Sequence, residues 1–94
     1  MERYTDTISG EELYTNTSLC DKTYFKDKAM TIRHRIDGPA FELVTGSKAW
    51  YVNGKRHRID GPAIVYHNES KVWYVNGVFI MRLDKDGKIV ERME

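Results

Sequence analysis

The sequence predicts an all-β protein, mainly an elongated antiparallel β-meander of 23-residue hairpin repeats. Three observations support this expectation. The heptapeptide HRIDGPA occurs at residues 34–40 and again at 57–63. The pentapeptide WYVNG occurs at 50–54 and again at 73–77, in the same 23-residue register. Between these strings lie short segments rich in β-branched and aromatic residues, a composition that is typical of strands.

Residues 1–21 are expected to form an N-terminal segment that is irregular or helical. Ser9 and Glu12 have the spacing of a helix capping box. The polar run of Thr, Asn, Thr and Ser at 15–18 would end such a helix.

Residues 22–94 are expected to form the hairpin-repeat domain, with full repeats at 34–56 and 57–79. Residues 22–28 and 78–93 read as degenerate units on either side. Terminal units of a repeat array are commonly atypical, because their outer edges face water.

Each full repeat is expected to contribute two strands joined by turns. The expected strands are residues 40–44 and 48–52 in the first repeat, and 63–66 and 71–75 in the second. The Asn-Gly pairs at 53–54 and 76–77 predict two-residue hairpin turns, because both residue types tolerate positive φ. In the Asp-Gly-Pro strings at 37–39 and 60–62, we expect Asp to bond its own backbone, Gly to adopt the unusual φ and Pro to begin an edge or bulged strand.

The composition describes one small domain without a disulfide. Its 94 residues contain 15 Lys and Arg against 14 Asp and Glu, a balance that does not indicate a nucleic-acid or anionic-membrane partner. The single cysteine, Cys20, excludes an intrachain disulfide and favours a reducing compartment. No apolar leader follows Met1, and no run of 18 apolar residues occurs. These features predict a soluble cytoplasmic protein.

The string WYVNGKRHRIDGPA at 50–63 is followed by an apolar strand and a second WYVNG. This pattern resembles the MORN-type repeat, and most closely the MORN-2 variety of the YwqK-like antitoxin family found in bacteria and their viruses. The resemblance covers about residues 22–87. It implies an elongated single-layer antiparallel sheet built of hairpins. For function it implies an interaction module, which in some relatives is an antitoxin or inhibitor.

Adjacent aromatic residues occupy strands at Trp50-Tyr51 and Trp73-Tyr74. Neighbouring residues of a strand point to opposite faces, so each repeat places one aromatic side chain on each face. A substantially exposed row would be an interaction patch, and these four residues are our candidate partner-binding site. Alternatively, the sheet curls or the N-terminal segment folds back, and both rows are covered. An exposed row could also be buried in an isologous homodimer.

The basic pairs His34-Arg35 and His57-Arg58 form an alternative site at equivalent places in the two repeats. Such a row could bind phosphates or acidic side chains. In the competing structural interpretation, each arginine pairs with the aspartate two residues later and the histidines pack against aromatic rings. We favour the structural interpretation, because repeated motifs mostly encode the fold.

No motif in the sequence indicates catalysis, and we expect neither an enzyme nor a cofactor. The three histidines have weak metal-ligand spacing, so no metal site is expected. Cys20 has no activating neighbour and is not expected to be a nucleophile.

The leading functional hypothesis is a non-enzymatic module that docks a partner protein through an aromatic sheet face. It would act as an inhibitor or antitoxin. One option is a phage protein that is directed at a bacterial enzyme or defence system. One alternative is a binder or sponge of small anionic ligands such as nucleotides, through the His/Arg rows. Another is RNA or single-stranded DNA binding, against which the near-neutral charge counts.

Overall fold

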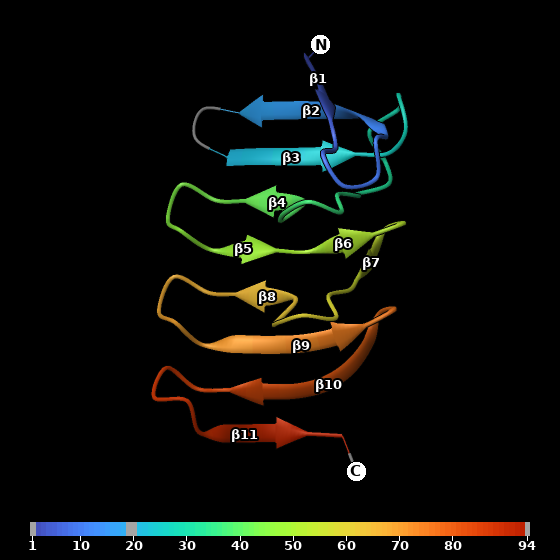
Figure 1. Cartoon of the computed structure of the whole chain (residues 1–94). Coiled ribbons are helices and arrows are strands. Elements are labelled where there is room, and N and C mark those ends of the chain that lie inside the picture. Colours follow the sequence, from blue (N-terminus) through green and yellow to red (C-terminus); the bar gives the residue numbers. More distant parts are fainter. Residues whose placement is uncertain (1, 19–20, 94) are drawn as a thin grey trace.

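In the computed structural model, which describes residues 2–18 and 21–93, the chain is an antiparallel meander of eleven strands. Nine strands form one sheet whose spatial order follows the chain, and β6 and β7 pair beside it (Figure 1). The strands are β1 (Glu2–Thr5), β2 (Glu12–Ser18), β3 (Asp21–Phe25), β4 (Phe41–Glu42), β5 (Lys48–Ala49), β6 (Tyr51–Val52), β7 (Lys55–Arg56), β8 (Ile64–Val65), β9 (Lys71–Val75), β10 (Val78–Leu83) and β11 (Ile89–Arg92). The predicted all-β meander is confirmed. Cys20 lies outside the described residues.

The helical option for the N-terminal segment is wrong, because β1 and β2 form a hairpin at the edge of the same sheet. Gly10, with a φ of 77°, belongs to the hairpin loop, where its N–H donates to the carbonyl of Asp6 at 2.9 Å. That left-handed conformation is incompatible with a right-handed helix. Alternation along β2 buries Leu13 and Thr15, and the polar run expected to end a helix is part of this strand.

The turns predicted from the repeat lie where they were expected. Asn-Gly turns join β6 to β7 and β9 to β10, with φ values of 52° and 80° in the first and 50° and 80° in the second. At the other end of the sheet, loops at 43–47, 66–70 and 84–88 connect successive strands. In each loop the N–H of the first residue donates to the carbonyl of the fifth at 2.9 Å. The repeat therefore has one turn chemistry at each end of the sheet.

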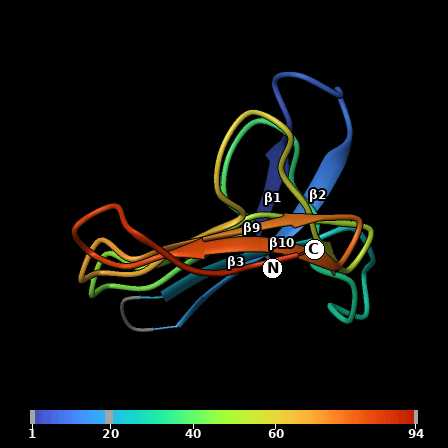
Figure 2. The ribbon, with the colours of Figure 1, turned by 90° about the horizontal axis from the view of Figure 1, so that it is seen from below.

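Two loops, residues 34–40 and 57–63, rise from one face of the sheet, on the same side as β1 (Figure 2). We call this face the loop face. Trp50 lies at the base of the second loop, where its N–H donates to the carbonyl of Ala63 at 2.7 Å and its carbonyl accepts from the N–H of His57 at 3.1 Å. The chain thus leaves the sheet near His57 and returns at Ala63, and the intervening residues project.

A core cluster lies on the opposite face. Because side chains alternate along a strand, Ala49 and Tyr51 point away from the side occupied by Trp50. Ala49, Ile64 and Val72 are buried there, and the aromatic side chains packed against them are Phe41, Tyr51, Tyr74 and Phe79. No helix in the described part of the chain is long and apolar enough to cross a membrane.

Candidate functional site

The two raised loops share the same supporting hydrogen bonds. The N–H of Arg35 donates to the carbonyl of Tyr51 at 3.1 Å, and Nδ1 of His34 accepts the N–H of Asn53 at 2.9 Å. The equivalent bonds 23 residues later have the same lengths. In Figure 2 the two loops accordingly follow the same course above the sheet.

The arginine of each loop folds back over the loop itself. Nε of Arg35 donates to Asp37 at 2.5 Å, and its guanidinium carbon lies 4.2 Å from the ring centre of Tyr24. Arg58 pairs with its own loop aspartate at 3.1 Å and lies 3.9 Å from the ring centre of Trp50. Each arginine is therefore held by an ion pair with a carboxylate and by a cation–π contact with an aromatic ring.

This arginine explains the glycine of the Asp-Gly-Pro string and corrects our expectation for it. Neither Gly38 nor Gly61 has a positive φ, so an unusual backbone conformation does not explain why glycine occupies these positions. Instead, a Cβ at Gly38 would lie 2.9 Å from the guanidinium carbon of Arg35, and one at Gly61 would lie 2.9 Å from that of Arg58. Glycine is needed because the arginine crosses it closely. The aspartates also differ from expectation, since their carboxylates bind the arginine rather than their own backbone.

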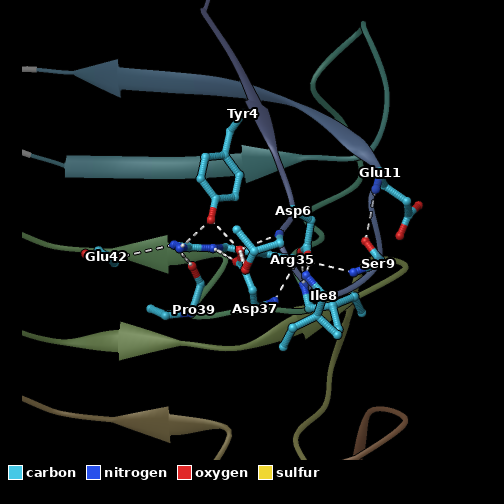
Figure 3. A network of polar contacts seen from close by, with 11 residues as sticks. Tyr4, Asp6, Ile8, Ser9, Glu11, Arg35, Asp37, Pro39 and Glu42 are labelled. Atoms are coloured by element: carbon cyan, nitrogen blue, oxygen red, sulfur yellow. Dashed lines mark hydrogen bonds and ion pairs between the residues drawn. The ribbon is translucent and has the colours of Figure 1, made fainter.

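The N-terminal hairpin covers the first raised loop (Figure 3). The carboxylate of Asp6 accepts the backbone N–H groups of Ile36 at 2.6 Å and Asp37 at 3.1 Å. The hydroxyl groups of Tyr4 and Thr7 both donate to the carboxylate of Asp37, the latter at 2.8 Å. This loop is therefore bound by a segment that lies about thirty residues earlier in the chain.

Glu11 adds a further contact between the hairpin and the first loop. Its Oε1 lies 2.9 Å from Nε2 of His34, whose side chain is buried. Because Nδ1 of His34 accepts a backbone N–H, Nε2 carries the ring proton and donates to the carboxylate.

Hydrogen bonds lower the pKa of three carboxyl groups at this contact. Burial alone would raise the pKa of Asp6, but four backbone N–H donors outweigh it and hold that pKa below its ordinary value. Burial would also raise the pKa of Asp37, but hydrogen bonds from Tyr4, Thr7 and Arg35 outweigh burial and hold that pKa well below its ordinary value. For Glu11 the bond from His34 is the largest cause of the lowered pKa.

No segment of the described chain covers the second raised loop in this way. The side chain of Asp60 is 87% exposed, whereas that of Asp37 is 5% exposed. Ile59 is 81% exposed. Among residues 2–18 and 21–93, the N–H groups of Ile59 and Asp60 and the Nε2 of His57 have no hydrogen-bond partner. These are the counterparts of the groups that bind Asp6 and Glu11 in the first loop.

A cleft of about 530 Å³ separates the two raised loops on the loop face. We call it the interloop cleft. It is lined by Ile8, residues 35–39, Trp50, Val52 and residues 57–60. Its lining is largely apolar. Both of its arginines are paired with aspartates, so it presents few unpaired charges. Its volume is in the range of ligand-binding clefts.

The four aromatic residues proposed as the partner site are divided between two faces, as alternation predicts, and all are half-buried. On the loop face, Trp50 lies in the interloop cleft beneath Arg58. On the core face, Tyr51 and Tyr74 pack against the core cluster. Trp73 alternates with Tyr74 in β9 and so lies on the loop face. No aromatic row is fully exposed. Trp50 borders the interloop cleft, and Tyr51 borders a smaller cleft of about 190 Å³ beside the core cluster.

The His/Arg rows proposed as an anion site differ between the repeats. His34 and Arg35 are bound to Glu11, Asp37 and other acceptors, so they take part in the loop contact described above. His57 and Arg58 line the interloop cleft, and Arg58 pairs with its loop aspartate. The ion pairs of the structural interpretation are therefore present in both repeats.

Sequence reasoning missed the residues from the N-terminal hairpin and the two loop isoleucines. Ile8, Ile36 and Ile59 line the cleft, and Asp6 and Glu11 bind the first loop. One signal was available in the sequence: an isoleucine stands between charged residues at the same place in both copies of HRIDGPA. An apolar residue repeated inside a polar loop favours a contact role.

Comparisons with family models, with curated proteins and with solved structures find no match to this chain. Within the described residues, no group of three or more His, Cys, Asp or Glu side chains is placed to hold a metal ion.

Proposed function

We propose that this chain is a non-enzymatic interaction module that docks a partner protein through the loop face, with the interloop cleft as the centre of the contact. The observation that carries the proposal is the apolar cleft floored by Trp50 and flanked by Ile8 and Ile59, which are 71% and 81% exposed. Buried aromatic anchors surrounded by apolar residues are the usual energetic centre of a protein interface.

The charges of the cleft support a protein partner over a small anionic ligand. A nucleotide needs unpaired cationic donors, but Arg35 and Arg58 are each paired with an aspartate. RNA and single-stranded DNA would need the same donors in greater number, and the chain has a formal net charge of only +1.

The specific role of inhibitor or antitoxin draws on the resemblance of the repeats to the MORN-2 and YwqK-like antitoxin pattern. On that resemblance, the partner is a bacterial enzyme or a component of a defence system, and the chain acts by covering part of its surface. The motifs that support this role are the two copies of HRIDGPA and of WYVNG.

Photo-crosslinking in the native cells tests the docking surface. A crosslinking amino acid at Ile59, on the rim of the cleft, should capture one discrete protein. The matched control is the same amino acid at Val44, which is 66% exposed but lies in the turn at the far end of the sheet, and it should not capture that protein. The proposal fails if position 59 captures no protein, or captures nucleic acid instead.

A further inference from the structure

We propose that the interloop cleft binds an acidic turn of the partner protein, in the way that the first raised loop binds the N-terminal hairpin of this chain. This inference rests on the proposed function and names the chemistry of the partner. Its basis is an internal comparison, because the two loops are built alike and the described part of the chain covers only the first of them.

The N-terminal hairpin shows what such a loop recognises. One carboxylate, that of Asp6, bridges two consecutive backbone N–H groups of the loop. That carboxylate also accepts the N–H groups of Ile8 and Ser9, and so closes its own turn. An aromatic ring two residues earlier, that of Tyr4, packs edge to face on Tyr24 at 5.2 Å.

The second loop presents the same groups without a ligand. Trp50 stands in the place of Tyr24, since the loop arginine stacks on each of these rings. The N–H groups of Ile59 and Asp60 correspond to those that bind Asp6 in the first loop. His57 offers a proton on Nε2, because its Nδ1 accepts the N–H of Asn76 at 2.9 Å. In the described part of the chain no acceptor reaches these three donors.

The first-loop ligand sits over Tyr24, and the corresponding space over Trp50 is the interloop cleft. Its volume of about 530 Å³ admits the side chains of a short turn rather than a folded domain. The donors of the second loop select a carboxylate, and the half-buried Trp50 favours an apolar or aromatic neighbour beside it.

The partner in this proposal is another protein rather than a second copy of this chain. The hairpin that could fill the cleft in a second copy is already bound to the first loop through Asp6, Tyr4 and Glu11. Offering it to another molecule would break those hydrogen bonds. The expected partner segment is therefore an acidic turn that carries an aromatic residue two positions before its carboxylate.

The probe for the test is a cyclic peptide with the sequence of residues 4–13, YTDTISGEEL, added to the isotope-labelled full chain. Nuclear magnetic resonance should show shifts of the Ile59 and Asp60 amides and of the Trp50 indole, because the first loop is already covered. The same peptide with Asp6→Asn should bind at least about tenfold more weakly, since it loses charged hydrogen bonds.

Matched variants of the full chain sharpen the result. Asp60→Asn replaces with a neutral amide the carboxylate that corresponds to the one bound by Tyr4 and Thr7 in the first loop, and the loss of charged hydrogen bonds should weaken peptide binding severalfold. Asp86→Asn makes the same charge change in the exposed loop at 84–88 and should leave binding unchanged.

Four outcomes would overturn the inference. They are the absence of shifts at millimolar peptide, equal binding of the Asn peptide, shifts confined to residues 34–38, and concentration-dependent shifts at residues 57–60 without peptide. The last would identify a second copy as the occupant. If the peptide fails while position 59 still captures a protein in cells, the acidic-turn inference falls and the proposed function stands. If position 59 captures no protein, the proposed function falls even where the peptide binds.

Discussion

At the scale of single residues, the internal repeat provides matched pairs whose chemistry is the same and whose surroundings differ. Asp37 and Asp60 both pair with the loop arginine. Asp37 also accepts from the hydroxyls of Tyr4 and Thr7 and is nearly fully buried. The difference between the two positions therefore isolates the hairpin contact from the loop itself.

We expect Asp37→Ala to lower the free energy of unfolding by about 3 kcal/mol, because it leaves buried partners without their acceptor. Asp60→Ala should change it by less than about 0.5 kcal/mol, as exposed ion pairs contribute little. Urea unfolding of the two variants beside the parent measures both values. Equal losses at the two positions would show that the hairpin contact contributes nothing to stability.

The loop glycines form a second matched pair. A methyl group at either glycine would lie 2.9 Å from the guanidinium carbon, so the arginine must move. Arg35 is held by Asp37 and Glu42 and is 14% exposed, whereas Arg58 is 25% exposed and pairs only with Asp60 among charged groups in the described chain. The second arginine can therefore shift at lower cost.

Gly38→Ala should consequently destabilise by about 1 to 3 kcal/mol, the range for overpacking a filled site, and Gly61→Ala by clearly less. Thermal or urea unfolding decides the order. Variants that both match the parent would mean that the arginines do not restrict these positions.

At the scale of elements, the meander could be predicted from the sequence because its turns are local. The Asn-Gly pairs determine two hairpins with no help from distant residues, and the structure places positive φ at both. The N-terminal hairpin could not be predicted in the same way. Its loop is held by Asp6 on the backbone of Ile36 and by Glu11 on His34, contacts that span 30 and 23 residues.

The candidate site was also predicted only in part, because some of its features are local in the sequence and others depend on distant residues. Alternation correctly separated Trp50 from Tyr51 onto opposite faces. The cleft itself depends on two loops that rise from the sheet, and the glycines that permit this are explained by an arginine three residues earlier. A spacing of that kind carries no signal in turn statistics, and the hairpin binds the first loop through contacts that span 30 and 23 residues. The cleft and the role of the hairpin could therefore not be predicted from the local sequence.

The contact of the N-terminal hairpin should depend on pH. The pKa values of Asp6, Asp37 and Glu11 are lowered in the folded chain. Carboxyl groups with lowered pKa add stability above their unfolded value of roughly 4, and this stability is lost as the pH falls through the folded values. The free energy of unfolding should therefore stay level near neutral pH and decline below about pH 4.

Hydrogen exchange at single amides locates that loss. Protection of the Ile36 and Asp37 amides, which bind Asp6, should fall with acidification before the β9–β10 hairpin loses protection. The amide of Ile59, which has no partner in the described chain, serves as the internal control and should not change. Loss of protection in all strands at the same pH would indicate global acid unfolding instead of release of the hairpin.

At the scale of the whole molecule, the chain is one extended layer. Its principal extents are 40, 27 and 21 Å, and its radius of gyration of 13.6 Å exceeds the roughly 12.4 Å typical of a compact domain of this length. Its accessible surface of 6151 Å² likewise exceeds the roughly 5,600 Å² typical of an 11.0 kDa monomer. An open sheet of this kind leaves its edges and part of its faces available to other molecules.

Self-association remains a prediction, and the structure favours the β11 edge over an aromatic face. Both rows of aromatic residues are half-buried, whereas every residue of β11 is exposed and Ile89 and Val90 are 54% and 50% exposed. An uncovered edge strand can pair with its copy about a two-fold axis, which continues the sheet and leaves the interloop cleft free.

The N–H of Met93 donates inward to the carbonyl of Ile80 at 2.7 Å, so alternation directs the N–H of Arg92 outward, toward such a copy. Proline at that position removes this donor and obstructs the edge. We therefore expect the parent to sediment as a concentration-dependent dimer at high micromolar concentration and Arg92→Pro to sediment as an 11.0 kDa monomer. Arg92→Lys, which keeps both the charge and the N–H, should dimerise like the parent. A parent that stays monomeric, or a dimer that survives the proline, would show that β11 is not an association edge.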